Sequence, residues 1–168
     1  IIFRPHNVYG ERQNIGDKYR NVIGIFINNA MNKEKLPIFG DGEQQRAFSY
    51  IDDVAPIIVS SIKNKKNYNN IFNIGSDHPH TVNELAEIIK EIHNEPLEKE
   101  YHPVRNEVKV AYSDHSKIAD FFRIKKYTNL KDGVDKMYKW AVKNGARKSK
   151  KFGNIEISKN LPPSWNTL

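Results

Sequence analysis

The chain has 168 residues, no cysteine and a formal net charge of +7, with 27 lysines and arginines against 20 aspartates and glutamates. This length is enough for one domain with a hydrophobic core, and the lack of cysteine excludes a disulfide scaffold and a thiolate metal site. No apolar run approaches the length of a membrane span, so we expect no membrane partner and a cytoplasmic protein.

The positive charge is concentrated near the C-terminus. From Lys131 onward, nine basic residues face three acidic ones, whereas the first 130 residues are nearly neutral. The basic run at 147–151 could attract nucleic acid or anionic lipid, but such runs are more often solvated, and this one lacks interleaved aromatic residues. We therefore expect no nucleic-acid binding, and we divide the chain into a domain at 1–146 and a basic, proline-containing extension at 147–168.

The first elements alternate short strands with a helix. Residues 1–3 are apolar and predict a buried strand of a parallel sheet, followed by a loop that ends at Gly10. Asn21 precedes an apolar pattern of helical spacing that runs to about Asn32, and we expect it to cap that helix. Residues 36–39 predict a strand that leads into a tight turn at Gly40.

The stretch after this turn predicts a strand and then a helix. Its residues alternate, with Arg46, Phe48 and Tyr50 expected on one face and Ala47, Ser49 and Ile51 on the other. Asp52 and Asp53 predict an acidic start for a helix at 54–63. An arginine beside aromatic residues at the exit of a turn can grip a phosphate and stack on a base or sugar. A surface arginine on an edge strand fits this stretch equally well.

The second half continues the alternation. A strand at 71–74 ends at Gly75, and Thr81 with Glu84 forms a capping box before a helix that runs to about Asn94. Residues 98–102 and 108–111 predict extended segments, Asp114 begins a short helix that runs to 122, and 130–144 predict a final amphipathic helix. The pattern indicates an α/β fold with short strands.

Catalytic motifs are scarce in this sequence. We find no pair of histidines at metal-ligand spacing, so we expect no metal site. The sequence also lacks a phosphate-binding loop and the Gly-x-Ser-x-Gly motif that carries a nucleophilic serine. The candidate groups are amides and guanidiniums, namely those of Asn7, Asn21, Arg46 and Arg105. Such donors suit an anionic ligand, and a diphosphate is the obvious one. The residues themselves thus predict the binding of a ligand and indicate no reaction.

Several blocks resemble, in order and spacing, the C-terminal half of the NAD-dependent nucleotide-sugar epimerase/dehydratase family, the extended short-chain dehydrogenases. The blocks are Arg4–Gly10, Gly40–Asp53, Phe72–Gly75, and Glu107–Lys109 followed by Asp114 and Lys117. The resemblance covers roughly residues 1–145 and implies the last Rossmann strand or strands joined to a small mixed α/β substrate-binding domain. It places the glycine-rich NAD fingerprint and the catalytic Tyr-x-x-x-Lys pair on a preceding Rossmann half, and we expect neither of them within this chain. We therefore expect a fragment that is inactive alone.

The resemblance also implies roles for single residues. Pro5 and His6 would lie beside the nicotinamide of the cofactor NAD, and Asn7 would hydrogen-bond the diphosphate or sugar. The nucleotide would lie against a helix N-terminus and apolar side chains. The residues expected there are Asn21, Val22, Ile38 and Phe39.

Two arginines are expected to clamp the diphosphate. In the resemblance these are Arg46 and Arg105, with Phe48 nearby, while the carboxylate of Glu107 takes the ribose hydroxyls. The family usually has a longer spacing here than the single Asn106 that separates Arg105 from Glu107. This shortening can re-aim Arg105, so its role is less firmly implied than that of Arg46.

The resemblance implies the substrate-binding half of a 4-epimerase that acts on UDP-glucose or UDP-galactose, in a full-length protein that forms a homodimer. The alternatives are the same half of a 4,6-dehydratase or of a decarboxylase, because their distinguishing acids and bases lie in the other half. A third alternative of a different class is a non-catalytic nucleotide-binding module.

Overall fold

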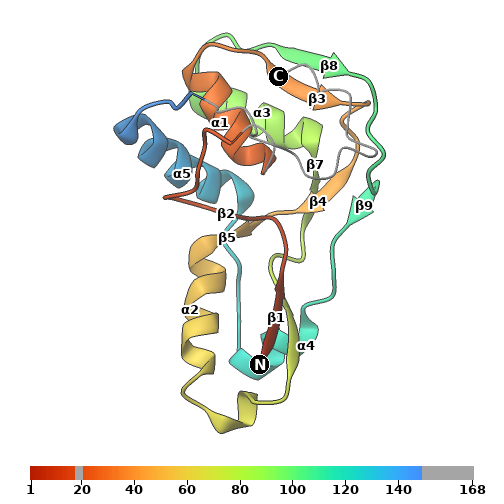
Figure 1. Ribbon diagram of the computed structural model, residues 1–168, viewed down its shortest axis with the longest axis vertical. Coiled ribbons are helices and arrows are strands. Elements are labelled where there is room, and N and C mark those ends of the chain that lie inside the picture. The colour runs from red at the N-terminus through yellow and green to blue at the C-terminus, as the bar shows by residue number, and fades with distance from the viewer. Residues whose placement is uncertain (18–20, 149–168) are drawn as a thin grey trace, which may run out of the picture.

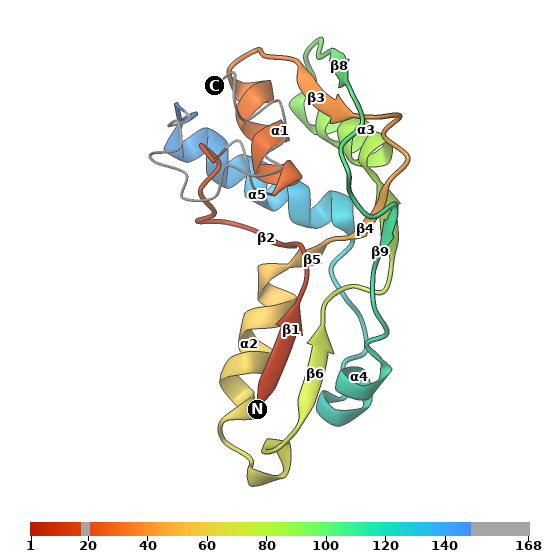
Figure 2. The ribbon, with the colours of Figure 1, turned by 45° about the vertical axis from the view of Figure 1, so that its right-hand side comes forward.

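The computed structural model describes residues 1–17 and 21–148, and its elements form two lobes joined at a narrow waist (Figure 1). The lower lobe holds two parallel strands, β1 (Ile2–Pro5) and β6 (Ile71–Ile74), with Ile2 opposite Ile71. In Figure 2, α2 (Ile51–Ser61) lies beside β1 and α4 (Ser116–Phe122) beside β6. A short 3₁₀ turn, η1 (Lys65–Asn67), lies between α2 and β6.

The upper lobe consists of three helices and a second strand pair. The helices are α1 (Val22–Met31), α3 (Val82–His93) and α5 (Leu130–Asn144), and the parallel strands are β3 (Leu36–Phe39) and β8 (Lys99–His102). Apolar residues at helical spacing from all three helices meet in the larger hydrophobic core, among them Phe26, Leu85 and Met137.

The waist is made of short strands. β2 (Val8–Tyr9) pairs in parallel with β5 (Ser49–Tyr50), while β4 (Gln45–Ala47) lies between β7 (Pro79–Thr81) and β9 (Val110–Ala111). Because the chain passes repeatedly between the lobes here, segments that are distant in sequence become neighbours. The predicted α/β class with short strands is confirmed.

A separate, smaller hydrophobic core holds the lower lobe together. Its buried members are Val54, Phe72, Ile74 and Ile118. Phe72 is fully buried and stacks on Phe3, with ring centroids 5.7 Å apart, while Phe121 and Phe122 meet its ring edge-on. One aromatic ring therefore connects both strands of this lobe with α4.

The stretch around Arg46 differs from its predicted alternation. The strand breaks at Phe48, and residues 47–50 are all buried rather than alternately exposed. The reason is that this segment runs through the waist, where protein covers both of its sides. The following helix begins at Ile51, earlier than predicted, with Asp52 and Asp53 in its first turn. Asp53 accepts hydrogen bonds from the backbone N–H and hydroxyl of Thr128, at 2.7 and 3.0 Å.

The opening strand is exposed rather than buried as predicted. Ile1 and Ile2 are 41% and 55% exposed, and the neighbouring Ile71 is 44% exposed. Within the described residues, β1 has a pairing partner on one edge only, which is β6, so the apolar residues at its start stay exposed. The β1–β6 pair therefore presents an apolar edge.

Two further observations bear on the predicted boundaries. The predicted extension at 147–168 lies outside the described residues apart from Arg147 and Lys148. The backbone of Arg147 exchanges two hydrogen bonds with the side-chain amide of Asn28 on α1, at 2.8 and 2.9 Å. No helix in the described part of the chain is long and apolar enough to cross a membrane.

Candidate nucleotide-sugar site

Asn7 joins the end of β1 to the strand that carries Arg46. Its backbone has a positive φ of 43°, and its side-chain amide donates to the carbonyl oxygen of Ala47 at 3.1 Å. In return, its carbonyl accepts from the backbone N–H of Ser49 at 3.1 Å. Ligands of open α/β sheets collect at the carboxyl ends of strands, which is where Asn7 lies.

Asn21 caps α1, as predicted. Its side-chain oxygen accepts from the backbone N–H of Ile23 at 3.3 Å, and its amide nitrogen donates to the carbonyl of Val8 at 2.8 Å. Val8 is the next residue after Asn7, so the cap fixes the N-terminus of α1 against the Asn7 loop. This N-terminus, at Val22, presents backbone N–H groups that favour an anion.

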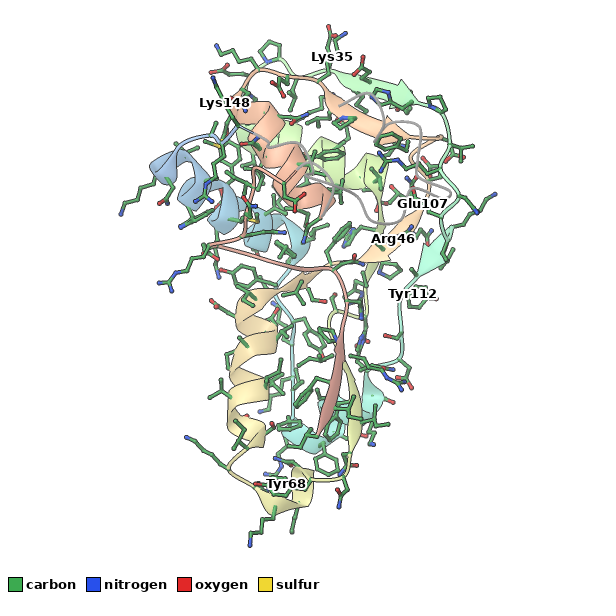
Figure 3. All side chains as sticks on the ribbon, in the orientation of Figure 1. Lys35, Arg46, Tyr68, Glu107, Tyr112 and Lys148 are labelled. Carbon is green, nitrogen blue, oxygen red and sulfur yellow. The ribbon has the colours of Figure 1, made fainter. Side chains whose placement is uncertain are left out.

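Arg46 is held by a carboxylate and two carbonyls (Figure 3). Its guanidinium lies 2.8 Å from the carboxylate of Glu107 and donates to the carbonyls of Gln45 and Lys109, at 2.8 and 3.3 Å. Only 16% of the Arg46 side chain is exposed, against 38% for Glu107. The two residues predicted to contact a diphosphate and a ribose therefore contact each other.

Arg105 lies flat on an aromatic ring close to this pair. Its guanidinium carbon is 3.2 Å from the centre of the Phe39 ring, and the imidazole of His102 stacks on that ring 5.1 Å away. Burial lowers the pKa of Arg105, while the negative charge of Glu107 opposes that shift. Glu107 thus acts on both guanidiniums.

The structure gathers most of the predicted substrate residues into one connected group. Contacts run from the Asn21 cap through the Asn7 loop to β4, where Arg46 meets Glu107, and the charge of Glu107 acts on Arg105 above Phe39. The Ile38 side chain is not available to a base, because it is fully buried in the core. Phe48 is also buried and lines a cavity that does not include Arg46.

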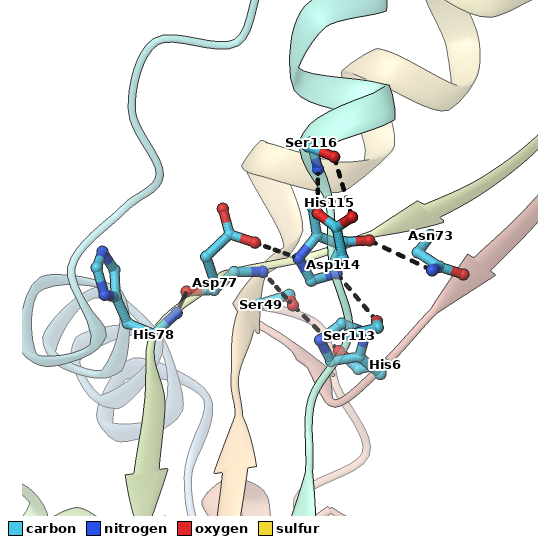
Figure 4. A network of polar contacts seen from close by, with 10 residues as sticks. His6, Ser49, Asn73, Asp77, His78, Ser113, Asp114, His115 and Ser116 are labelled. Atoms are coloured by element: carbon cyan, nitrogen blue, oxygen red, sulfur yellow. Dashed lines mark hydrogen bonds and ion pairs between the residues drawn. The ribbon is translucent and has the colours of Figure 1, made fainter.

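A polar network that the sequence did not predict lies at the waist (Figure 4). His115 is fully buried and lies 2.6 Å from the carboxylate of Asp77, and its other ring nitrogen is 3.3 Å from the hydroxyl of Ser113. His6 stacks on His115, with ring centres 4.8 Å apart. These residues come from three segments that cross the waist, and the sequence gives no sign that these segments meet.

The stacked pair predicts a pH dependence of stability. Burial, and then the neighbouring His115, lowers the pKa of His6 below its ordinary value of 6.5. Between that lowered pKa and 6.5, the folded chain binds fewer protons than the unfolded chain, so its stability falls as the pH is lowered through this window. We expect the free energy of unfolding, measured in urea, to drop as the pH is lowered through 6.5. His6→Gln should reduce this slope.

The matched control for that measurement is His78→Gln, which removes an exposed imidazole from the same region. It should leave the slope unchanged. Equal slopes for His6→Gln and the unsubstituted chain would show that His6 does not carry the effect.

Two cavities lie beside the loop between α4 and α5. The larger, of about 720 Å³, is lined by residues of Ser76–His80 and Ile124–Leu130 together with Phe48. The smaller, of about 510 Å³, lies between Asp53, the same loop and the first turns of α5. Among the predicted site residues, only Phe48 lines either one, and the sequence analysis assigned no role to the loop.

The expectation that the chain has no Tyr-x-x-x-Lys spacing was wrong, because Tyr127 at the end of that loop and Lys131 at the start of α5 form one. The two side chains do not form a catalytic pair. Lys131 lies 2.7 Å from the carboxylate of Glu91, and burial raises the pKa of Tyr127 to about 12. A catalytic tyrosine needs the opposite shift, because it has to accept a proton near neutral pH. The presence of the spacing therefore does not supply the family's proton-transfer chemistry.

The comparisons with known proteins agree with each other. Residues 1–75 match the model of the NAD dependent epimerase/dehydratase family. A putative UDP-glucose 4-epimerase of Methanocaldococcus jannaschii is 34% identical over 151 residues, which cover 85% of this chain and 46% of that protein. A UDP-N-acetyl-alpha-D-glucosaminuronate decarboxylase of Bacillus cytotoxicus is 28% identical, covering 83% of this chain and 45% of its own length.

A solved structure shows the same fold. The UDP-glucose 4-epimerase of Thermotoga maritima, determined with UDP-glucose, superposes with a TM-score of 0.76 at 31% identity. The alignment covers 84% of this chain and 45% of that one. The expected architecture, late Rossmann strands joined to a small mixed domain, is confirmed. The chain spans less than half the length of these relatives.

Proposed function

Because the chain belongs to the NAD dependent epimerase/dehydratase family, we propose that it forms the substrate-binding part of a nucleotide-sugar 4-epimerase of the UDP-glucose type. The observation that carries this proposal is the connected group in which the Asn7 loop bonds Ala47 beside Arg46, while Glu107 pairs with Arg46 and its charge acts on Arg105. A diphosphate needs charged donors from more than one side, and this group supplies two guanidiniums with an amide nearby.

In the proposed complex, the diphosphate replaces the carboxylate of Glu107 on Arg46. The freed carboxylate then accepts from the ribose hydroxyls, while Arg105 approaches the diphosphate from the other side. The base takes the face of the Phe39 ring that Arg105 covers in the unbound chain, with Val22 and Asn21 at the α1 N-terminus beside the nucleotide. Ile38 contributes through its backbone, and Phe48 supports the strand from the opposite side.

The family's cofactor, NAD, supplies a hydride acceptor for the sugar when it is bound. This chain contributes the edge of such a site, at Pro5 and His6 on the carboxyl end of β1. The residues present fit the border of a cofactor site and do not form a binding site for the cofactor's phosphates. The sequence contains no Gly-x-Gly-x-x-Gly, and Gly75 is packed so closely against Ser49 and His6 that no space for a phosphate remains there. We therefore propose that a preceding half holds the cofactor and performs proton transfer, and that residues 1–168 alone are inactive.

Binding by this part serves the reaction by holding the nucleotide while the sugar changes its orientation. A fixed diphosphate lets the sugar turn without leaving the protein, which converts a bimolecular encounter into a positioned step. A decarboxylase of the same family would use the same grip, and the similarity to the Bacillus cytotoxicus decarboxylase keeps that as the second candidate. We further propose a cytoplasmic homodimer, with residues 147–168 as an extension outside the site.

The test of this proposal is a titration of the chain with UDP and then UDP-glucose, followed by ¹H–¹⁵N NMR. We expect amide shifts at Asn7, Asn21 and Val22, at Arg46, and over Arg105–Glu107. Shifts confined to other surfaces would contradict the proposed site. Tighter binding to an oligonucleotide than to UDP, with a steep salt dependence, would favour a nucleic-acid-binding module instead.

A further inference from the structure

The larger of the two cavities has no role in the proposed function. It opens between the β6–β7 connection and the loop that joins α4 to α5, and neither Arg46 nor Arg105 lines it. Its volume of about 720 Å³ falls within the range of small-molecule sites, which is roughly 300–1,000 Å³.

The charged residues at this cavity are two lysines and two acids. Two lysines line it, Lys125 and Lys126, and in the described part of the chain neither makes an ion pair or hydrogen bond. The two acidic residues on its wall already have partners. Asp77 is paired with His115 at 2.6 Å, and Glu84 accepts from the backbone N–H of Thr81 at 3.0 Å within the α3 capping box. Two ammonium groups therefore remain available to a ligand.

An unused donor lies at the same wall. The hydroxyl of Tyr127 is buried and has no hydrogen-bond partner among the described residues. Since burial, and then the negative charges of Asp77 and Asp53, raise the pKa of Tyr127 to about 12, this hydroxyl keeps its proton at neutral pH and can donate to an acceptor. Because this hydroxyl exposes less than 1 Å² to solvent, a ligand in the cavity reaches it only when the Tyr127 side chain turns, and the unpaired donor favours such a contact.

The opposite wall is apolar. Phe48 and Leu130 are 4% and 5% exposed, and Pro79, Ala119 and Ile124 also line the cavity. If a free inorganic anion were bound, this apolar surface would stay in contact with water. A ring-bearing molecule would cover it and remove its apolar area from water.

We infer that this cavity binds a small organic phosphate, with the phosphate on Lys125, Lys126 and the Tyr127 hydroxyl and the ring against Phe48. The ligand is a second, separate one, and the inference does not depend on the proposed nucleotide-sugar site. The cavity is lined by the α4–α5 loop, whose Thr128 is hydrogen-bonded to Asp53 at the start of α2. A ligand bound in the cavity would therefore connect the two lobes through this loop.

The experiment uses phenyl phosphate as the probe, titrated into the full chain and followed by ¹H–¹⁵N NMR. We expect saturable amide shifts over Ser76–His80 and Lys125–Asn129, with a lower dissociation constant than for inorganic phosphate because the ring covers the apolar wall. Saturating UDP should leave these shifts in place. Absence of shifts at both segments would overturn the inference, and so would displacement of phenyl phosphate by UDP.

Variants separate the charge from the fold. Lys125→Gln with Lys126→Gln should weaken phenyl phosphate by about tenfold or more, as expected for two lost charged contacts. Tyr127→Phe should weaken it by a smaller factor. Lys63→Gln with Lys65→Gln removes the same charge from exposed positions near the end of α2, and should change the dissociation constant little. If both double variants weakened the binding of phenyl phosphate equally, the effect would come from net charge alone, and the proposed site would be overturned.

Discussion

Replacing Phe72 with alanine is expected to lower the free energy of unfolding by about 3–5 kcal/mol, the usual cost of deleting a buried aromatic ring. Phe72 is fully buried and contacts Phe3, Phe121 and Phe122. The lower lobe has only a small core, so the loss of this ring leaves little to hold β1, β6 and α4 together. Urea unfolding monitored by circular dichroism measures the change.

The matched control is Phe121→Ala, which removes the same kind of side chain from a position that is 43% exposed. It should cost about 1 kcal/mol or less, because little apolar area returns to water. Hydrogen exchange of the Phe72→Ala chain should show lost protection in β1 and β6, with α1 and α3 still protected. Similar costs for the two variants would contradict the assignment of Phe72 as the centre of this core.

Replacing Arg46 with alanine is expected to weaken UDP binding by roughly 10- to 150-fold, or about 1.5–3 kcal/mol, the range of a hydrogen bond to a charged group. The loss has two sources, because the guanidinium is removed and Glu107, its partner at 2.8 Å, is left as an unpaired negative charge beside the phosphates. Calorimetric titration with UDP measures the dissociation constant.

A second substitution separates these two sources. Arg46→Ala combined with Glu107→Gln removes the repulsion and should recover part of the lost affinity. Arg4→Ala, on the exposed face of β1, removes an arginine outside the site and should leave the dissociation constant unchanged. An unaltered affinity in Arg46→Ala would refute the role proposed for this residue.

Local signals in the sequence were reliable where one side chain decides the conformation. The capping box of Thr81 and Glu84 correctly predicts the start of α3, and Asn94 ends that helix in a left-handed conformation. Asn21 caps α1 through its own oxygen. In each case the residue acts within a few positions of itself, so no knowledge of the rest of the fold is needed.

Burial at the waist could not be read in the same way. Residues 47–50 have an alternating pattern, but neighbours that are distant in sequence cover both of their sides, so Phe48 and Ser49 are both buried. Likewise, the opening apolar residues predict a buried strand, yet β1 has a single pairing partner in the described residues. A sequence pattern reports which side chains avoid water, and not what is present to cover them.

The candidate site was predictable as a set of residues and not as an arrangement. The guanidinium and amide candidates are indeed brought together, but the pairing of Arg46 with Glu107 depends on β4 lying beside β9. The cavity beside Tyr127 depends on two loops that are distant in sequence. Neither loop has a motif of its own, so only their meeting in space reveals them.

The parallel pairing of β1 with β6 has a consequence for the order of folding. Between these two strands the chain must build β2, α1, β3, β4, β5, α2 and η1, so their pairing closes a long loop and bears a corresponding entropic cost. Local helices of the upper lobe can form without that cost, whereas the lower lobe has to wait for the intervening chain to become compact. In refolding experiments, amides of β1 and β6 should therefore gain protection later than those of α3.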